Sequence, residues 1–282
     1  MKTKIKSTIS DKFIWLFLIL FCTLTVIPLV FMLTASFMRA IDIVKMPYKW
    51  IPIPFYIKNY YNAIAGSDHS FIYLRNILNS LIVAVSVTCT TILLSSIVGF
   101  GLAKYKFKGR NVVFLSIMAT MMIPFETIMV PMYMVVMNLH MQNTYAGLII
   151  PFMVNAFAVF QMRQYIITFP DDILDASRID GSSEPGIFFR VVFPNCVPAI
   201  ATISVLTFRQ QWDNLLWPLL VAQSEKMKTI PAYIVKFAAE KYADEGVMMA
   251  VAVIASLPIF ALFICLSKYF VGGSSVYSAG KE

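Results

Sequence analysis

The sequence predicts an all-α integral membrane protein with six transmembrane helices, and three observations carry this prediction. Hydrophobic residues make up 59% of the 282-residue chain and charged residues 13%, whereas about a quarter of the residues in soluble domains are charged. The mean hydropathy is +0.75. The apolar residues form six continuous runs, which favours helices, because barrel strands are about 10 residues long and alternate in polarity.

The six apolar runs are each long enough to cross a bilayer as a helix. About 20 residues at a rise of 1.5 Å per residue span a hydrocarbon core of roughly 30 Å. The first run exceeds the apolar core of about 7 to 15 residues in a signal peptide, which favours a retained anchor over the alternative, a cleaved leader. The expected spans are Phe13–Phe37, Ser80–Ala103, Val112–Met137, Ala146–Ile166, Cys196–Ala222 and Val247–Val271.

Prolines recur inside these spans. A proline kinks a helix by freeing a backbone carbonyl, which suits a bundle that opens and closes, although proline is also simply common in membrane helices. The prolines concerned are Pro28, Pro124, Pro131, Pro151, Pro198, Pro218 and Pro258.

The distribution of basic residues predicts the orientation. The short loop KYKFKGRN, which begins at Lys104, carries four basic residues and no acid, and Lys and Arg accumulate in cytoplasmic loops. We therefore expect this loop, both termini and the polar segment 169–194 to be cytoplasmic. The net charge of +8 is dispersed over loops, so nucleic-acid binding is not expected.

Few residues in the chain could form a metal or catalytic site. The four cysteines lie in or at the edges of spans, where they act as small apolar residues, and the two histidines are expected on the outer face. The sequence has no GxxxxGK[ST] phosphate loop, so this chain is expected to bind neither ATP nor a metal and not to be an enzyme.

A polar segment, FPDDILDASRIDGSSEPGIFFRVVFP at 169–194, separates two apolar runs. Asp171 and Asp172 can cap a helix N-terminus and favour it electrostatically, and Gly181 suits the left-handed residue after the end of the helix. The expected helix of about nine residues is shorter than the roughly 12 to 15 that an isolated helix needs. It therefore requires a partner.

A second helix is expected directly after this turn. Ser182 or Ser183 can cap it, Glu184 and Pro185 suit its first turn, and IFFRVVF then runs apolar toward the membrane. The small residues at 175–177 would let another protein approach the backbone of the first helix closely.

The stretch DASRIDGSSEPGIFFRVVFPNCVP resembles the cytoplasmic loop motif of binding-protein-dependent ABC importer permeases. That motif reads Glu-Ala-Ala, two residues, Asp-Gly-Ala, and later Leu-Pro. Further stretches, AKYKFKGRN, MIPFETIMVPMYMVV, NTYAGLIIP and WDNLLWPLL, resemble the sugar-transporting, maltose-type branch, whereas the ending VGGSSVYSAGKE departs from it. The positions that match the loop motif, and that the resemblance assigns to ATPase coupling, are Asp175, Ala176, Ser177, Asp180, Gly181, Ser182 and Pro194.

The resemblance implies a type I ABC importer permease fold (MetI-like), with six transmembrane helices and a cytoplasmic coupling helix. It implies a permease domain at 76–271, preceded by a tail, first span and outer loop at 1–75 and followed by a tail at 272–282. It also implies partners: a second permease subunit, a dimer of ATP-binding subunits that holds the ATP and Mg²⁺, and an external solute-binding protein. The cargo would be a carbohydrate, and lipid would surround the spans in the cell membrane.

Polar side chains inside spans are candidates for a solute pathway, because they are costly in lipid and usually face a cavity or a partner. Arg209 and Asp213 are four residues apart and are expected to pair with each other on one helix face. The candidates for the pathway are Gln210, Gln211, Trp212, Asn214, Glu126 and Asn155.

The sequence also leaves other functions open. An ion-gradient-driven secondary transporter would use Glu126 and Asp213 as coupling sites and would need no docking helix. An ABC importer could also carry a polyol or a sugar phosphate. A membrane enzyme has no plausible nucleophile and base pair in this sequence.

Overall fold

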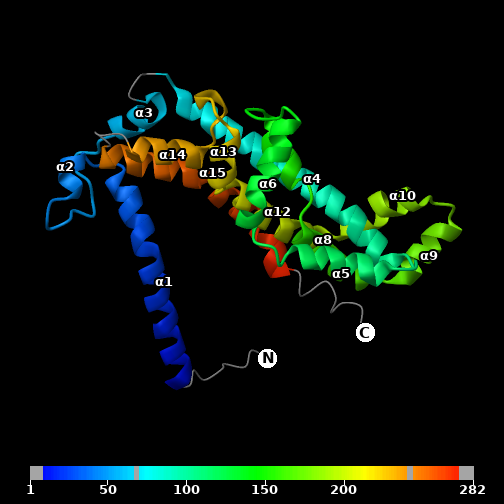
Figure 1. Cartoon of the computed structure of the whole chain (residues 1–282). Coiled ribbons are helices and arrows are strands. Elements are labelled where there is room, and N and C mark those ends of the chain that lie inside the picture. The colour runs from blue at the N-terminus through cyan, green and yellow to red at the C-terminus, as the bar shows by residue number, and fades with distance from the viewer. Residues whose placement is uncertain (1–8, 67–69, 240–243, 273–282) are drawn as a thin grey trace. The chain divides into compact units, whose positions relative to one another are not determined.

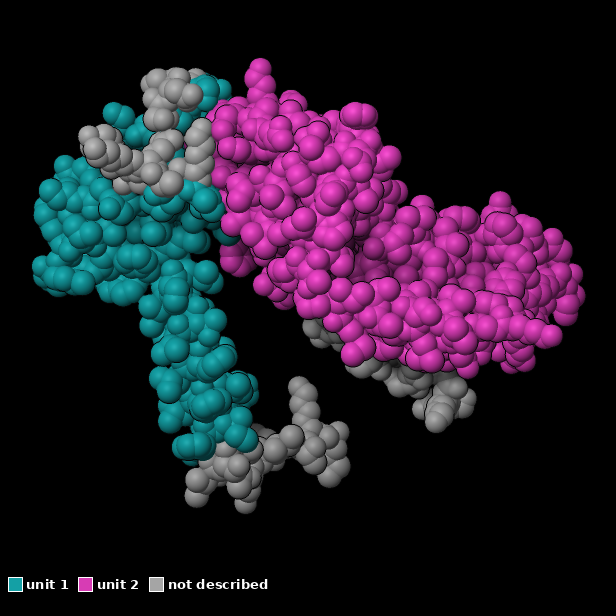
Figure 2. Space-filling model, in the orientation of Figure 1, with its two compact units in different colours: residues 1–71, 234–256 teal, residues 72–233, 257–282 magenta. Residues whose placement is uncertain are grey.

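The computed structural model describes residues 9–66, 70–239 and 244–272, and every regular element in these ranges is a helix (Figure 1). The chain divides into two compact units (Figure 2). Unit 1 comprises residues 1–71 and 234–256, and unit 2 comprises residues 72–233 and 257–282. Most of the expected tail at 272–282 lies outside the described residues.

Three helices are each long and apolar enough to cross a membrane by themselves. They are α1 (Ile9–Ala35), α4 (Ile72–Lys104) and α15 (Glu245–Gly272). Three bent helix pairs pass the same test together, so the described residues hold up to six spans if each pair counts as one. Pro28 and Pro258 lie inside α1 and α15, which continue through them.

The third, fourth and fifth apolar runs are each broken into shorter helices and do not form one straight helix. The third is α5 (Arg110–Thr120) and α6 (Phe125–Asn138), which bend by 97° at Pro124. The fourth is α7 (Tyr145–Ile149) with η1 (Ile150–Phe152), followed after a bend of 45° by α8 (Ala156–Ile167).

The fifth run also breaks. Its main helix is α12 (Val197–Trp212), and α13 (Leu216–Val221) follows only after a gap of three residues. The helices that precede α12 bend away from it by 76°. Pro198 sits in the first turn of α12, where its missing N–H costs nothing.

The centre of unit 2 is α4, which packs against α8 and α12. At a rise of 1.5 Å per residue its 33 residues extend about 50 Å, more than a hydrocarbon core, so its ends reach beyond the bilayer. Small residues on its buried face let neighbouring helices approach closely, which is how membrane helices associate. They include Ala84, Ser95, Ser96 and Gly99.

Two apolar clusters occupy different ends of unit 2. One lies between α8, α12 and the C-terminal part of α4, and it includes Phe100, Met162 and Ile203. The other lies among α4, α6, α7 and α13, and its centre is Trp217, whose indole Nε1 donates to the carbonyl of Gly147 at 3.0 Å.

Polar side chains at the start of α4 hold the loop that contains η3 (Glu225–Met227). Asn79 Nδ2 donates to the carbonyls of Lys226 and Lys228, each at 2.8 Å, and the backbone N–H of Ile230 donates to Ser80 Oγ at 2.8 Å. The loop leads into α14 (Ile230–Ala239).

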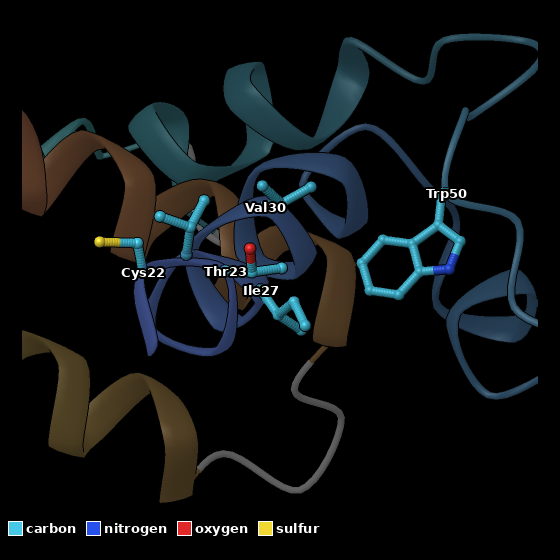
Figure 3. Close-up of a pocket in the computed structure, with 6 residues that line it drawn as sticks. Cys22, Thr23, Ile27, Val30 and Trp50 are labelled. Atoms are coloured by element: carbon cyan, nitrogen blue, oxygen red, sulfur yellow. The ribbon is translucent and has the colours of Figure 1, made fainter. Parts of the chain in front are cut away.

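Unit 1 contains α1, α2 (Ala40–Ile43) and α3 (Lys58–Ala65). Asn59 Nδ2 ties α3 to the end of α1 by donating to the carbonyls of Ser36 at 3.0 Å and Met38 at 2.6 Å. Trp50 turns its ring toward α1 and, with Ile27 and Val30, lines an apolar groove of about 480 Å³ (Figure 3). The loop that follows α1 and carries Trp50 is therefore folded back on that helix.

Candidate functional site

The polar segment 169–194 forms a helix, a tight turn and a second helix, as predicted. The first helix, α9 (Asp171–Ile179), has nine residues. Asp171 and Asp172 lie in its first turn, but neither caps it, because the residue before the helix is Pro170 and no side chain bonds the free N–H groups there. The two carboxylates favour this end through the helix dipole instead.

A Schellman turn ends α9. The backbone N–H of Ser182 donates to the carbonyl of Ser177 at 3.0 Å, and that of Gly181 donates to the carbonyl of Arg178 at 3.0 Å. Gly181 has a φ of +79°, a left-handed backbone conformation that residues with a Cβ adopt only at an energetic cost. The sequence therefore identified the residue on which the turn depends.

Ser183, one of the two predicted caps, begins the second helix. Its Oγ accepts from the backbone N–H of Gly186 at 3.3 Å at the start of α10 (Glu184–Ile187). The chain continues through η2 (Phe188–Val192), a π-helical turn, and α11 (Phe193–Asn195) into α12. Pro194 lies in this later part and is exposed, with no contact to the motif residues of α9 among the described interactions.

Leu174 anchors α9 to the rest of unit 2. Its side chain is 1% exposed and belongs to the cluster of Phe100, Ile166, Ile187 and Phe188. One buried residue fixes one face of the helix, and the opposite face is left to solvent.

The exposed face of α9 lies opposite Leu174, because residues three or four apart share a helix face. Asp175 and Ala176 lie on it, together with Asp172 and Ile179. Ile179 is 87% exposed, which is high for a large apolar side chain. Ser177 lies elsewhere, half-buried, with Oγ donating to the carbonyl of Ile173 at 2.8 Å.

An ion pair from Arg178 joins α9 to the second helix. Arg178 donates from Nη1 to Asp175 at 2.6 Å and from Nε to Glu184 at 2.8 Å, and the hydroxyl of Tyr105 also donates to Glu184, at 2.6 Å. The hydrogen bonds from Arg178 and then Tyr105 hold the pKa of Glu184 below its usual value. The same carboxylates raise the pKa of Arg178, the Glu184 contact contributing most.

The pathway candidates on α12 separate into exposed and buried residues. Gln210 is exposed and lines a cavity of about 330 Å³ with Arg209 and Asp213, which form the expected ion pair at 3.4 Å. Gln211 and Trp212 are buried, and the Trp212 ring stacks on a neighbouring phenylalanine.

The remaining pathway candidates lie on other elements. Asn214 Oδ1 accepts from the backbone N–H of Trp217 at 3.4 Å, after the end of α12. Asn155 caps α8 by accepting from the N–H of Phe157 at 2.8 Å, and Glu126 is exposed in the first turn of α6. The described contacts bring neither Asn155 nor Glu126 to the cavity at Gln210.

Sequence reasoning did not single out Ile179 or Tyr105. Ile179 is a lone isoleucine in the polar stretch DASRIDGSS, and its isolation was a usable signal. Tyr105 is 79 residues from Glu184, and nothing in the local sequence indicates that the two side chains meet.

Comparisons with known proteins agree with this architecture. Residues 91–275 match the protein family described as "Binding-protein-dependent transport system inner membrane component". The chain is 38% identical over 205 residues to the arabinooligosaccharides transport system permease protein AraQ of Bacillus subtilis (strain 168), covering 73% of each chain. It is 31% identical over 264 residues to the sn-glycerol-3-phosphate transport system permease protein UgpE of Brucella abortus (strain 2308), covering 92% of this chain and 93% of the relative.

A solved structure supports the same fold. A chain from a bacterial ABC transporter involved in the import of the acidic polysaccharide alginate has a TM-score of 0.82 and 21% identity, covering 93% of this chain and 98% of that one. At this identity the likeness speaks for the fold alone. The fold class predicted from the sequence is confirmed.

Proposed function

The chain belongs to the family of binding-protein-dependent transport system inner membrane components, and on this premise we propose that it is the permease subunit of an ATP-driven importer for a sugar or oligosaccharide. The chain supplies part of the membrane pathway. A second permease subunit completes the pathway, a pair of ATPase subunits holds ATP and Mg²⁺, and an external binding protein delivers the solute.

The proposal rests on α9, which has one buried face and one exposed face. Leu174 fixes one face to the permease, and the opposite face presents Asp172, Asp175, Ala176 and Ile179. We call these four residues the docking face. They suit a groove with an apolar floor for Ile179 and a basic rim for the two carboxylates. The basic loop that begins at Lys104 favours a cytoplasmic position for this end of unit 2, where an ATPase would lie.

The proposed mechanism is a rigid-body movement. Closure of the ATPase pair on ATP moves the docked helix, and the bundle changes between inward-facing and outward-facing states. The exposed Gln210 beside the cavity on α12 offers amide hydrogen bonds to a sugar hydroxyl.

A second solute class has a specific observation in its favour. The relative named for sn-glycerol-3-phosphate transport matches 92% of this chain at 31% identity, whereas the arabinooligosaccharide relative matches 73% at 38% identity. A phosphorylated polyol is therefore the alternative cargo. Uptake of labelled oligosaccharides and of glycerol 3-phosphate by the same reconstituted complex distinguishes the two.

Substitution at Ile179 tests the docking of the ATPase. Ile179→Ser removes the exposed apolar side chain without touching the core, so the permease is expected to fold while less ATPase subunit co-purifies with it. Ile179→Met keeps an apolar side chain and should retain the ATPase. Equal recovery of ATPase with both variants would remove Ile179 from the docking contact.

A further inference from the structure

The last residue of α4 holds the beginning of α9. Lys104 Nζ donates to the carbonyl of Phe169 at 2.5 Å and to Asp171 Oδ1 at 2.6 Å. The Lys104 side chain is only 6% exposed, and a buried ammonium group is costly unless it is paired. Both partners flank Pro170, the residue before the helix, so Lys104 fixes the point at which α9 begins.

The next residue holds the other end of the same element. The Tyr105 hydroxyl donates to Glu184 Oε2 at 2.6 Å, and Glu184 is bonded in turn to Arg178 near the end of α9. The Tyr105 ring packs edge-on against Phe100 of α4, with centroids 5.6 Å apart. Burial and then the bond to Glu184 raise the pKa of Tyr105 to about 12, so the hydroxyl keeps the proton that it donates at physiological pH.

We propose that Lys104 and Tyr105 act together as a clamp that makes α9 and α4 move as one body, a role that rests on the proposed function. The clamp joins the docking face to the longest helix of unit 2 at two points, before and after α9. Because α4 packs on α8 and α12, a displacement of α9 would reach both helices. Lys104 and Tyr105 are positioning residues, since neither lies on the docking face.

The clamp explains how so short a helix could transmit force. Leu174 alone would let α9 pivot about one buried side chain. Two polar contacts on opposite sides of that pivot prevent the rotation, and charge-assisted hydrogen bonds of this length are directional. A movement of the docked helix would then displace α4 and not be absorbed by rotation of α9.

The test compares transport with ATP hydrolysis in liposomes that contain the complete complex. Lys104→Met and Tyr105→Phe, separately and combined, remove the clamp and keep most of each side chain. Lys108→Met is the matched control, because it removes a positive charge from the same loop without touching any clamp contact. Co-purification of the ATPase subunit is measured for every variant.

The clamp predicts that the combined variant transports at least about fivefold less solute per ATP hydrolysed, at the low end of typical couplings between sites. The amount of bound ATPase should stay that of the unsubstituted complex, and Lys108→Met should keep the normal ratio. A normal ratio in the combined variant would overturn the clamp.

A second pair of substitutions covers the case in which Lys104→Met prevents folding. Asp171→Asn combined with Tyr105→Phe weakens the same two contacts and leaves the buried Lys104 in place. This pair must also lower the transport-to-hydrolysis ratio; a normal ratio contradicts the clamp. Failure of the proposed function would look different, because the unsubstituted complex itself would show no ATP-dependent uptake.

Discussion

Gly99 on α4 and Met162 on α8 lie so close together that a Cβ at position 99 would come within 2.9 Å of the Met162 Cβ. It would also come within 3.0 Å of the backbone nitrogen of Arg163. The contact depends on a residue without a side chain, as close helix crossings in membranes often do. It fixes α4 to the helix that leads into the polar segment 169–194.

Gly99→Val is therefore expected to push α4 and α8 apart. Overpacking of this kind costs about 1–3 kcal/mol, and it should lower the melting temperature of the purified complex in detergent. Gly101→Val is the matched control, because a Cβ at position 101 meets nothing within 4 Å. Equal melting temperatures for the two variants would show that the crossing tolerates a side chain.

Gly181→Val should impair coupling through backbone strain alone. A Cβ at position 181 also meets nothing within 4 Å, but the left-handed conformation costs an ordinary residue about 1–2 kcal/mol. Gly181→Asn should be milder, because asparagine adopts this conformation more readily. Solute uptake is expected to fall in the order Gly, Asn, Val, and normal uptake by the valine variant would count heavily against the coupling role of this turn.

Gln210 and Trp212 should respond differently to alanine. Trp212 is 3% exposed and stacks on Phe208 with ring centroids 5.5 Å apart, so its loss should destabilise the protein by about 3–5 kcal/mol. Gln210→Ala should leave the melting temperature unchanged and raise the KM for solute uptake. Unchanged uptake kinetics in Gln210→Ala would remove that residue from the pathway.

Acid should loosen the polar segment. The hydrogen bond from Lys104 lowers the pKa of Asp171, and the bonds from Arg178 and Tyr105 lower that of Glu184. A carboxylate with a lowered pKa stabilises the fold above its unfolded pKa, about 4 to 4.5, and this stabilisation is lost as pH falls through the lower folded value. Pulsed hydrogen exchange at 171–187 should therefore show protection that falls below about pH 4.

Glu184→Gln is the control for the acid effect. Without that carboxylate the protection should depend less steeply on pH, while its value at neutral pH should already be lower. A profile identical to that of the unsubstituted protein would mean that the Glu184 contacts do not order the segment.

Much of the polar segment could be predicted from the sequence, because local rules govern it. The first-turn acids, Gly181 and Ser183 lie where helix-end preferences put them. The contacts of Lys104 and Tyr105 could not be predicted, since they join residues 67 and 79 positions apart and depend on how α4 packs.

For the membrane helices too, the local sequence predicted where the apolar segments lie, but not the features that depend on tertiary packing. Hydropathy located the apolar runs, and the first, second and sixth are continuous helices. Prolines marked several possible kinks, but they could not show which would bend a helix: the chain bends at Pro124, whereas α1 continues through Pro28. The bend before Asn155 was not expected at that residue. The burial of Trp212 also follows from tertiary packing, which hydropathy does not report.

Uptake by the reconstituted complex tests the central claim most directly. The chain, purified with its co-expressed partner subunits and supplied with its binding protein, is placed in liposomes, and labelled solute is followed with ATP inside or with an ion gradient alone. We predict uptake that requires ATP and is absent with the gradient alone. Uptake driven by the gradient without ATP would contradict the assignment and favour a secondary transporter.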